Sequence, residues 1–576
     1  MSRKSMRADS VAEAYLALLA ERGVEYLFGN AGTDFPPIIE ALAKAEASGG
    51  KAPRPILAAH ENLAISMAHG YAMVSGKVPA VMVHVNVGTA NTICGIANAA
   101  RENVPILVTA GRTPLTEEGL PGARDAYIHW GQEMYDQAGM LRELVKWDYE
   151  LRNGAQVEAV VDRALSIAAS EPAGPVYLTL PREVLAQGIN AAGEFTYEQP
   201  GRRVAAAPPR ADTSALAEAA RILAKAENPL IVTTNAGRHP DVMATLGAFA
   251  SRFAFPVVQF TPRYISLASS HEMQLGFDPA ARIAVADVVL VLESDVPWIP
   301  SRVSPPRDAQ VIHIGLDPLF QNTPIRGFLC DLAIQSLVAP ALNELSAALE
   351  PLVDGTRIET RRKRIAGERA ALQVGLERQR EELRHTRPLH PAWVSHCVSE
   401  AKGADAIVIS EYPLMLAHCD FETPGSFFAS SSASGLGWGF GAALGAKLAS
   451  PGRLVIATLG DGAFLFSNPV AAHYAAAAHD LPVLVVVYNN SMWNAVRRST
   501  LTMYPSGATA KSNKAPLMHL EALPAFERIC EACGGYGERV EDPDELPKAL
   551  ARAIEEVKKG RHALLNVICA APDGPI

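Results

Sequence analysis

The strongest indication of the fold lies in residues 459–490, LGDGAFLFSNPVAAHYAAAAHDLPVLVVVYNN. The apolar run RLVIAT just before it and the run VLVVVY inside it are typical of buried strands, with an alanine-rich helical segment between them. The first strand leads into Gly460-Asp461-Gly462 and the second into Asn489-Asn490. The carboxyl ends of strands in an α/β sheet open onto the ligand crevice. Glycines admit a phosphate and oxygen ligands suit Mg²⁺, so this stretch predicts a diphosphate and magnesium site.

Apolar runs alternate with amphipathic segments along the rest of the chain. The strand candidates are PAVMVHV (79–85), PILVTAG (105–111), PVYLTLP (175–181), PLIVTT (229–234), DVVLVLE (287–293), QVIHIG (310–315), AIVIS (406–410) and ALLNVI (563–568). This pattern predicts an α/β protein with three doubly wound parallel-sheet domains, at residues 1–190, 205–350 and 385–576. Between them, residues 190–212 predict a linker and residues 340–390 an exposed connecting helix.

Composition excludes several classes of protein. The 576 residues carry a net charge of −9, which argues against nucleic-acid binding because that needs a clustered basic face. The one basic run, RRKR at 361–364, is expected to be a solvated helix surface. No stretch reaches the roughly 18 apolar residues of a membrane span, and the N-terminal residues lack a signal-peptide core. We therefore expect a cytoplasmic protein without a membrane partner.

The cysteines predict free thiols. There are seven, an odd number, and they are scattered along the chain. Cys530 and Cys533 form a C-x-x-C without a second pair, in FERICEACGG. We expect this segment to be a helix that ends at a glycine cap.

A second motif, AAHENLAISMAHGYAMVSGK at 58–77, places Glu61 between a β-type run and an Ala/Met-rich helix. With GDG and NN on neighbouring strands, the chain resembles the thiamine-diphosphate-dependent 2-keto acid decarboxylase and carboligase superfamily. That superfamily has a glutamate after its second strand and then an A-x-G-Y-A helix, which residues 68–72 match. FGNAG at 28–32 and SASGLGWGFGAALGAKLA at 432–449 resemble two further segments of the superfamily. The resemblance implies a pyrimidine-binding, a central Rossmann-like and a diphosphate-binding domain, in that order.

The resemblance also implies the cofactors, thiamine diphosphate and Mg²⁺. The magnesium ligands would be the side chains of Asp461 and Asn490 and the backbone carbonyl of Met492. The implied cofactor contacts are Glu61, Ser434, Leu436, Gly460, Asp461, Gly462, Ala463, Asn490 and Met492. One departure is the separation of Asp461 and Asn490, which is 29 residues and about two longer than usual in the superfamily. A larger turn at residues 466–469 would absorb the difference.

Three of these residues have specific implied roles. Glu61 would push the aminopyrimidine of the cofactor toward its imino tautomer, which acidifies the thiazolium carbon. The carbonyl of Ser434 would accept from the aminopyrimidine amine, and Leu436 would prop the cofactor in its bent form. In that form the amine reaches the reactive carbon.

The substrate residues are implied by narrower likenesses. His84, 23 positions after Glu61, matches a histidine of benzoylformate decarboxylase and is suited to proton relay because its pKa lies near neutrality. Thr33 occupies the place of that enzyme's substrate-binding serine. Gln132 resembles a glutamine of acetohydroxyacid synthase and benzaldehyde lyase. The residues expected to line the substrate pocket are Thr33, His84, Trp493, Ala495 and Val496. A second active-site histidine of benzoylformate decarboxylase is not matched.

Several functions remain open at this stage. The resemblance favours a lyase that releases CO₂ and an aldehyde from a small 2-keto acid, with carboligation as a side activity. The alternatives are an acetohydroxyacid synthase-like transferase or a 2-hydroxyacyl-CoA lyase, although no convincing CoA-binding extension is seen after VICAAPDGPI (567–576). A flavin or nicotinamide oxidoreductase is disfavoured, and FAD is not expected, because TTNAGRHPD (233–241) stands in place of G-x-G-x-x-G. The resemblance implies a homodimer or homotetramer with shared active sites.

Overall fold

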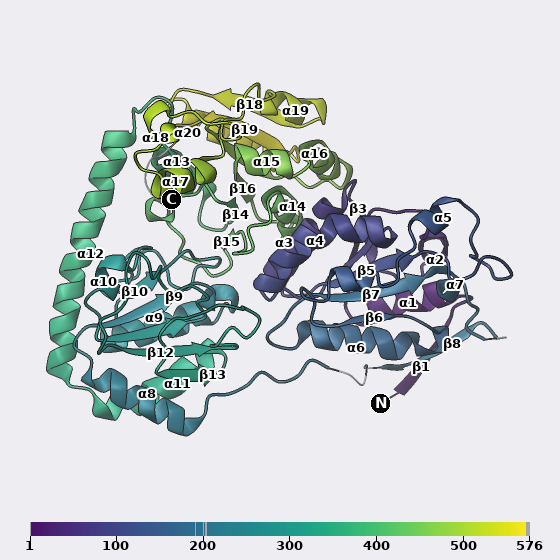
Figure 1. Ribbon diagram of the computed structural model, residues 1–576, viewed down its shortest axis with the longest axis horizontal. Coiled ribbons are helices and arrows are strands. Elements are labelled where there is room, and N and C mark those ends of the chain that lie inside the picture. The colour runs from purple at the N-terminus through teal and green to yellow at the C-terminus, as the bar shows by residue number, and fades with distance from the viewer. Residues whose placement is uncertain (1, 191, 200, 202–203, 572–576) are drawn as a thin grey trace.

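The computed structural model describes residues 2–190, 192–199, 201 and 204–571 and shows three α/β domains (Figure 1). Each domain is built on a sheet whose strands all run parallel, which confirms the predicted fold class. The strand candidates quoted above all form strands. Near-continuous apolar sequences such as Ala80–Val83 are buried on both faces, as helix-covered parallel sheets require.

The first domain has a six-stranded sheet in the order β3-β2-β4-β5-β7-β6. Its strands are β2 (Tyr26–Gly29), β3 (Arg54–Leu57), β4 (Ala80–Val83), β5 (Leu107–Arg112), β6 (Asp148–Glu150) and β7 (Val176–Pro181). The main helices are α1 (Val11–Glu21), α2 (Pro36–Ser48), α3 (Glu61–Ser75), α4 (Val85–Arg101) and α6 (Val157–Ala169). From β2 the chain passes to β3 on one side and then returns to β4 on the other side of β2. The carboxyl ends of β2 and β4 therefore flank a topological switch point of the sheet.

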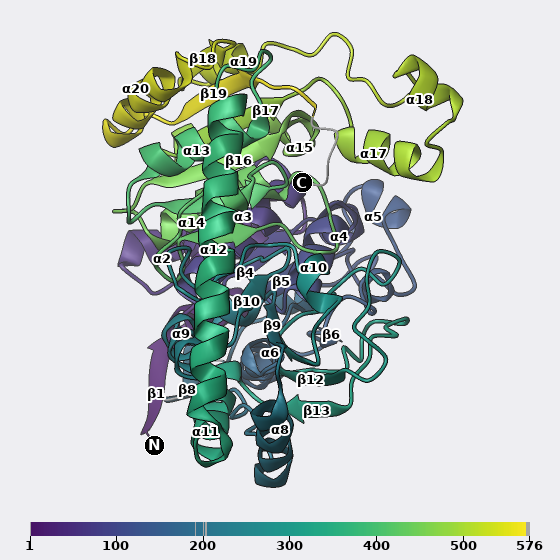
Figure 2. The same ribbon diagram turned by 90° about the vertical axis from the view of Figure 1, so that its left-hand side faces the viewer.

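The middle domain has a five-stranded sheet in the order β10-β9-β11-β12-β13. Its strands are β9 (Pro229–Thr233), β10 (Val257–Gln259), β11 (Val288–Leu292), β12 (Gln310–Gly315) and β13 (Leu332–Gln335), and its main helices are α8 (Thr213–Lys225), α9 (Val242–Phe253) and α11 (Val338–Leu349). The helix α12 (Gly355–Leu383) then runs along one side of the molecule from the middle domain to the third domain, as predicted (Figure 2).

The third domain has a six-stranded sheet in the order β15-β14-β16-β17-β19-β18. Its strands are β14 (Ile407–Glu411), β15 (Phe427–Ala429), β16 (Val455–Gly460), β17 (Leu484–Asn489), β18 (Tyr536–Val540) and β19 (Ala563–Ile568). Its helices include α13 (Pro391–Lys402), α14 (Trp438–Ala449), α15 (Asp461–Phe466), α16 (Pro469–Ala478), α17 (Asn494–Met503), α18 (Ala508–Ser512), α19 (Phe526–Ala532) and α20 (Leu546–Lys558). The helix α19 ends at Ala532, with Cys533 as its cap residue and Gly534 next at φ +85°, which confirms the predicted glycine cap.

The first and third domains meet through α3 and α14, which lie against each other at the centre of the molecule (Figure 1). Two glycines allow the close approach. A Cβ at Gly70 would lie 2.0 Å from the carbonyl oxygen of Ala442, and one at Gly445 would lie 1.9 Å from that of Met67. Any larger residue at either position would force the helices apart.

Two predictions were wrong. Residues 194–199, within the predicted linker, form strand β8 (Glu194–Gln199), which pairs antiparallel with β1 (Ser2–Arg7); residues 191, 200, 202 and 203 lie outside the described part. The RRKR run is not wholly solvated. Arg361 is buried because its guanidinium donates to the carbonyls of Ala226 (2.8 Å) and Phe253 (2.9 Å). Of the helices that the structure describes, none combines the length and the apolar character that crossing a membrane requires.

Candidate active site

The two strand ends predicted to hold diphosphate and magnesium lie side by side on the third sheet. Gly460 ends β16 and Asp461 begins α15, while Asn489 ends the neighbouring β17. The buried Asp461 carboxylate joins them, because it accepts from the backbone N–H of Asn490 (3.1 Å) and of Ser491 (2.6 Å). Burial raises the pKa of Asp461 above its ordinary value despite these hydrogen bonds. A nearby cation would relieve that cost.

The other groups at this edge fit a magnesium ion bound to a diphosphate. The side-chain oxygen of Asn490 accepts from the backbone N–H of Met492 (3.1 Å), which holds the amide over the same turn. A Cβ at Gly462 would lie 2.1 Å from the ring of Trp493, so only glycine lets this side chain close over the turn. Carboxylate, amide and carbonyl oxygens are the hard donors that Mg²⁺ prefers. A cavity of about 470 Å³ next to this turn is lined by Ser491, Lys514, Ala515, Pro516, His519, Leu520 and Glu521.

Glu61 lies at the carboxyl-end edge of the first sheet, as the first residue of α3. Its carboxylate accepts from the side-chain amides of Asn30 (3.1 Å) and Asn91 (3.0 Å), one on each oxygen. Burial alone would raise the pKa of Glu61. The hydrogen bonds from Asn91, from the backbone and from Asn30 outweigh burial, so the pKa lies below its ordinary value. Glu61 is therefore a rigidly held, ionised acceptor.

His84 follows β4 and precedes α4, at the same edge as Glu61. Its Nδ1 lies 2.5 Å from Oδ1 of Asp34, and its Nε2 lies 3.2 Å from the amide nitrogen of Gln132. The other Asp34 oxygen accepts from the backbone N–H of Val85 (3.2 Å), so the carboxylate is fixed on both sides. The hydrogen bond to Asp34 is the main reason that the pKa of His84 is raised above its ordinary value, against the effect of burial.

Glycines make room for this pair. A Cβ at Gly32 would lie 2.2 Å from Nδ1 of His84, and a Cβ at Gly111 would lie 1.7 Å from Oδ2 of Asp34. Thr33 lies between Gly32 and Asp34 and is exposed at the same edge. The sequence therefore predicted four residues that the structure brings together here: Thr33, Glu61, His84 and Gln132.

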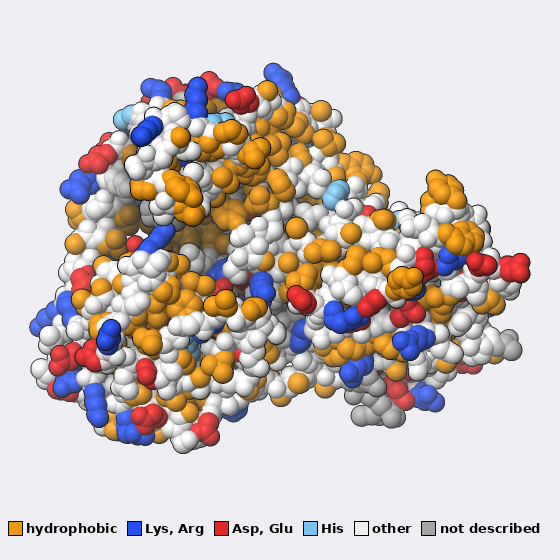
Figure 3. All heavy atoms as spheres, viewed as in Figure 1, with side chains coloured by type: hydrophobic (Ala, Val, Ile, Leu, Met, Phe, Trp, Pro, Cys, Tyr) orange, Lys and Arg blue, Asp and Glu red, His pale blue; other side chains and the backbone are white. Residues whose placement is uncertain are grey.

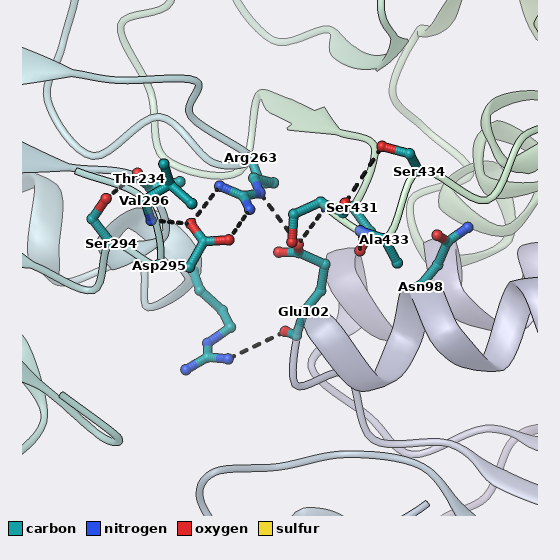
Figure 4. A network of polar contacts seen from close by, with 12 residues as sticks. Asn98, Glu102, Thr234, Arg263, Ser294, Asp295, Val296, Ser431, Ala433 and Ser434 are labelled. Atoms are coloured by element: carbon teal, nitrogen blue, oxygen red, sulfur yellow. Dashed lines mark hydrogen bonds and ion pairs between the residues drawn. The ribbon is translucent and has the colours of Figure 1, made fainter. Parts of the chain in front are cut away.

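The loop that carries Ser434 and Leu436 is held from both other domains. Glu102, at the end of α4, accepts from the guanidinium Nε of Arg263 (3.2 Å) and from the backbone N–H of Ser432 (3.3 Å). Arg263 also pairs with Asp295, through two N–H donors at 3.1 and 2.5 Å. Figure 4 shows this network, in which one residue of the first domain joins the middle domain to the loop. The loop's position therefore depends on all three domains.

Two more buried side chains shape this loop. The side-chain amide of Asn98 holds Gly435 twice: its nitrogen donates to the Gly435 carbonyl (2.9 Å) and its oxygen accepts from the Gly435 N–H (3.0 Å). Glu411, at the end of β14, accepts from the backbone N–H of Gly437 (2.8 Å) and of Gly439 (2.7 Å), at the start of α14. Burial raises the pKa of Glu411 to about 7. Ser434 has φ +56°, a strained value that this network maintains.

Sequence reasoning missed Asn30, Asp34, Asn91, Asn98 and Glu411. Asn30 and Asp34 lie in the GNAGTD segment that had drawn attention to Thr33, and Glu411 ends a recognised apolar strand. A polar residue just after such a strand was the available signal. The remaining predicted pocket residues lie near the turn at Asp461: Trp493 packs against Gly462, whereas Ala495 and Val496 are exposed on α17.

The comparison with known families matches this geometry. Residues 9–140 match the N-terminal TPP binding domain of thiamine pyrophosphate enzymes, residues 216–345 their central domain, and residues 409–567 their C-terminal TPP binding domain. The three matches occur in the order of the three sheets.

Relatives are similar along most of the chain. The acetolactate synthase large subunit of Lactococcus lactis is 25% identical over 98% of this chain and 93% of that protein. The benzoylformate decarboxylase of Pseudomonas aeruginosa is 26% identical over 85% of this chain and 87% of its own. Among solved structures, the thiamine diphosphate-dependent 4-hydroxybenzoylformate decarboxylase of Rhodococcus jostii has the same fold, with a TM-score of 0.77, 22% identity, and 98% of this chain and 100% of that chain covered. With all three domain types present in one chain, this protein belongs to the thiamine pyrophosphate enzyme family.

Proposed function

We propose that the protein is a thiamine-diphosphate-dependent lyase that removes CO₂ from a small 2-keto acid and releases an aldehyde, with carboligation as a side activity. The observation that carries this proposal is the arrangement of Asp34, His84 and Gln132 beside Glu61. It offers a proton donor and acceptor of raised pKa at the edge where the activating carboxylate lies.

The residues for the cofactor are those of the strand ends and the α14 loop. Asp461, Asn490 and the carbonyl of Met492 would hold Mg²⁺, and the backbone of residues 460–463 would face the diphosphate. When bound, thiamine diphosphate supplies a carbon nucleophile that adds to the substrate carbonyl and takes up the electrons left by CO₂. Glu61 would hold a proton at the pyrimidine ring nitrogen, and its two amide donors keep the carboxylate pointed for that contact.

His84 would move a proton at the substrate. With its Nδ1–H donated to Asp34, the neutral ring leaves Nε2 as the acceptor for the Gln132 amide. When substrate binds, Nε2 can give up its hydrogen bond with Gln132 and contact a substrate oxygen or carbon instead. Asp34 stabilises the imidazolium formed when Nε2 takes a proton, in the way an orienting carboxylate supports a catalytic histidine. Thr33 would bind the substrate carboxylate or hydroxyl at the same edge.

One copy of the chain does not bring these parts together. His84 lies just before the first residue of α4. Asn98, which holds Gly435, lies 14 residues further along that helix, so His84 and Asn98 are about 20 Å apart. The Ser434 carbonyl would hold the aminopyrimidine of bound thiamine diphosphate and His84 would act on the substrate, so one site would need both residues closer together than this. We propose that each site combines His84 and Glu61 of one copy with Ser434 and Asp461 of another.

Apolar side chains near both halves support this assembly. Figure 3 shows hydrophobic side chains gathered on the visible faces of the first and third domains. The exposed ones near the two halves are Val87, Tyr127, Trp130 and Tyr135 on the first domain, and Phe466, Val496, Met503 and Tyr504 on the third. Such patches on both sides of an incomplete site are expected of surfaces that a second copy covers.

Subunit mixing tests the shared site. The variants Glu61→Ala and Asp461→Ala are each expected to be inactive. In a mixed dimer isolated with two affinity tags, one site is intact and the other carries both substitutions, so about half of the wild-type activity should return. A mixed dimer as inactive as its parents, or a fully active monodisperse monomer, contradicts the shared site.

Asp34→Asn is expected to change the pH dependence of the reaction. Asp34 stabilises protonated His84, so its neutralisation lowers the pKa of His84, and the acidic limb of kcat/KM, which reports the neutral ring, moves to lower pH. The matched control is Asp125→Asn, because Asp125 pairs with Arg182 and His129 instead. An Asp34→Asn profile that coincides with wild type, whatever the loss of rate, makes Asp34 merely structural.

Product analysis separates lyase from transferase. The lyase should release CO₂ and aldehyde stoichiometrically from a 2-keto acid without an added acceptor. Gln132, so close to His84, favours acetohydroxyacid synthase-like transfer as the second candidate, in which turnover requires an acceptor carbonyl. Turnover only with a 2-hydroxyacyl-CoA identifies the third candidate, a 2-hydroxyacyl-CoA lyase. If a panel of aliphatic and aromatic keto acids gives no product, with or without acceptor, the result counts against both the lyase and the transferase.

A further inference from the structure

We propose that His473, Cys530 and His562 form a buried site for one thiophilic cation, Cu⁺ or Zn²⁺, in the third domain. The three lie on different elements: His473 on α16, Cys530 on α19 and His562 just before β19. None of them belongs to the candidate active site. In the part of the chain that the structure describes, this is the one group of three ligand-type side chains with such close spacing.

The geometry suits a single ion. One ligand atom from each residue lies within 4.8 Å of the other two. A point at the centre of such a triangle is at most 2.8 Å from each atom (4.8 Å divided by √3). Bonds from zinc to imidazole and thiolate are about 2.0–2.3 Å, so shifts of at most roughly 0.5–0.8 Å in the side chains close the site.

Gly535 leaves room for the side chains of Cys530 and His562 to approach each other. A Cβ at Gly535 would lie 2.4 Å from Sγ of Cys530 and 2.5 Å from Nε2 of His562. Both ligand atoms therefore point toward the same position next to Gly535. The ring of His473 lies against that of His562, with centroids 5.2 Å apart.

The imidazole ligand atoms are also short of partners, whereas Sγ of Cys530 donates to the backbone carbonyl of Tyr536 (3.4 Å). Among the residues that the structure describes, neither ring nitrogen of His473 has a hydrogen-bond partner, nor has Nε2 of His562. His473 and Cys530 have no exposed surface, and His562 keeps 5%. Buried polar atoms without partners cost free energy, which a bound cation would recover. His69 is buried and unpartnered as well, but it faces Trp438 and belongs to no such group.

Protonation favours a soft cation. Burial lowers the pKa of His473 to about 3 and that of His562 to about 4, so both rings are neutral ligands at neutral pH. Burial raises the pKa of Cys530 to about 12, so binding replaces its S–H bond by a metal–sulfur bond and releases a proton to solvent. Nitrogen and sulfur donors without carboxylates select Zn²⁺ or Cu⁺.

The surroundings distinguish the two ions. Phe440 and Phe464 pack against the ring of His473, so the pocket is apolar. Two neutral imidazoles and a thiolate give a neutral complex with Cu⁺, whereas Zn²⁺ leaves one buried positive charge and requires a fourth ligand. The balance favours Cu⁺, and both ions belong in the test.

The test uses the full chain with saturating Mg²⁺ and thiamine diphosphate, so that Asp461 does not attract the added ion. Protein stripped of transition metals is titrated with Cu⁺ under anaerobic conditions, and separately with Zn²⁺. Each titration contains a chromophoric chelator that competes for the ion and binds it more tightly than a single thiol does. Co²⁺ in place of Zn²⁺ reports thiolate ligation by its charge-transfer band. The variants are Cys530→Ser and His473→Leu. The matched control is Cys533→Ser, which removes the other cysteine of the C-x-x-C but none of the ligands.

Wild type and Cys533→Ser should bind one equivalent, and the ion should raise their melting temperature. Cys530→Ser and His473→Leu should bind more weakly, by more than the 10–100-fold typical of losing an outer-shell partner. Three results overturn the proposal: no stoichiometric binding of either ion to wild type, equal binding by Cys530→Ser, or equal loss in Cys533→Ser. The wild-type stoichiometry decides even where a variant does not fold.

Discussion

Asp461→Ala is expected to abolish binding of thiamine diphosphate and with it all activity. Asp461 is the one buried carboxylate at the two strand ends, and its burial without a cation already raises its pKa. Without it, the cation is lost and the charge of the diphosphate is uncompensated. The cofactor affinity should fall by more than the roughly 100-fold that outer-shell changes can cause. Calorimetric titration with Mg²⁺ and cofactor measures it.

A second variant separates charge from folding. Asp461→Asn keeps an acceptor for the backbone N–H groups of Asn490 and Ser491 but carries no charge, so it should fold and still bind cofactor poorly. In wild type, affinity for Mg²⁺ should increase as the pH rises through the raised pKa of Asp461, because the proton competes with the cation. Cofactor affinity that is equal with and without Mg²⁺ contradicts the assignment.

His84→Ala is expected to lower kcat by roughly 10²–10⁴-fold, the usual effect of removing a positioned acid or base. Cofactor binding should stay normal, because His84 lies beside Asp34 in the first domain and not at the turn of Asp461 in the third. The loss should be seen mainly in kcat and less in KM, since the proton transfer is made in the transition state.

His84→Asn is the companion variant. Its amide can still donate to Asp34 in place of Nδ1, so packing is kept while the titrating group is removed. We expect it to match wild type in melting temperature and cofactor affinity but to share the kcat loss of His84→Ala. If either variant is destabilised yet keeps a near-normal kcat, His84 is a packing residue.

Local sequence signals predicted the fold and the positions of the two strand ends at Asp461 and Asn490 well. The strands β16 and β17 are mostly apolar, and Asp461 and Asn490 follow them directly, so the strand pattern also indicated where the polar residues lie. The spacing of 29 residues is accommodated by two helices, α15 and α16, separated at Ser467 and Asn468, the latter at φ +51°.

Contacts between distant residues could not be predicted in the same way. Asp34 and His84 are 50 positions apart, and nothing in either segment alone indicates their hydrogen bond. Arg361 was expected in solvent because charge runs usually are, but long side chains can reach buried carbonyls. The strand β8 was missed because Pro and Gly around it hid the alternation of buried Phe195 and Tyr197 with polar neighbours.

Deuterium exchange at the thiazolium C2 of the bound cofactor is the most direct test of the account, since it requires no knowledge of the substrate. We propose that Glu61 activates thiamine diphosphate in this protein. With Mg²⁺ and cofactor bound, wild type should exchange this proton rapidly, and Glu61→Gln should bind the cofactor yet exchange it roughly 10²-fold or more slowly, because an amide cannot share the proton of the ring nitrogen. Exchange in Glu61→Gln at the wild-type rate, measured by NMR after acid quench, would contradict the claim.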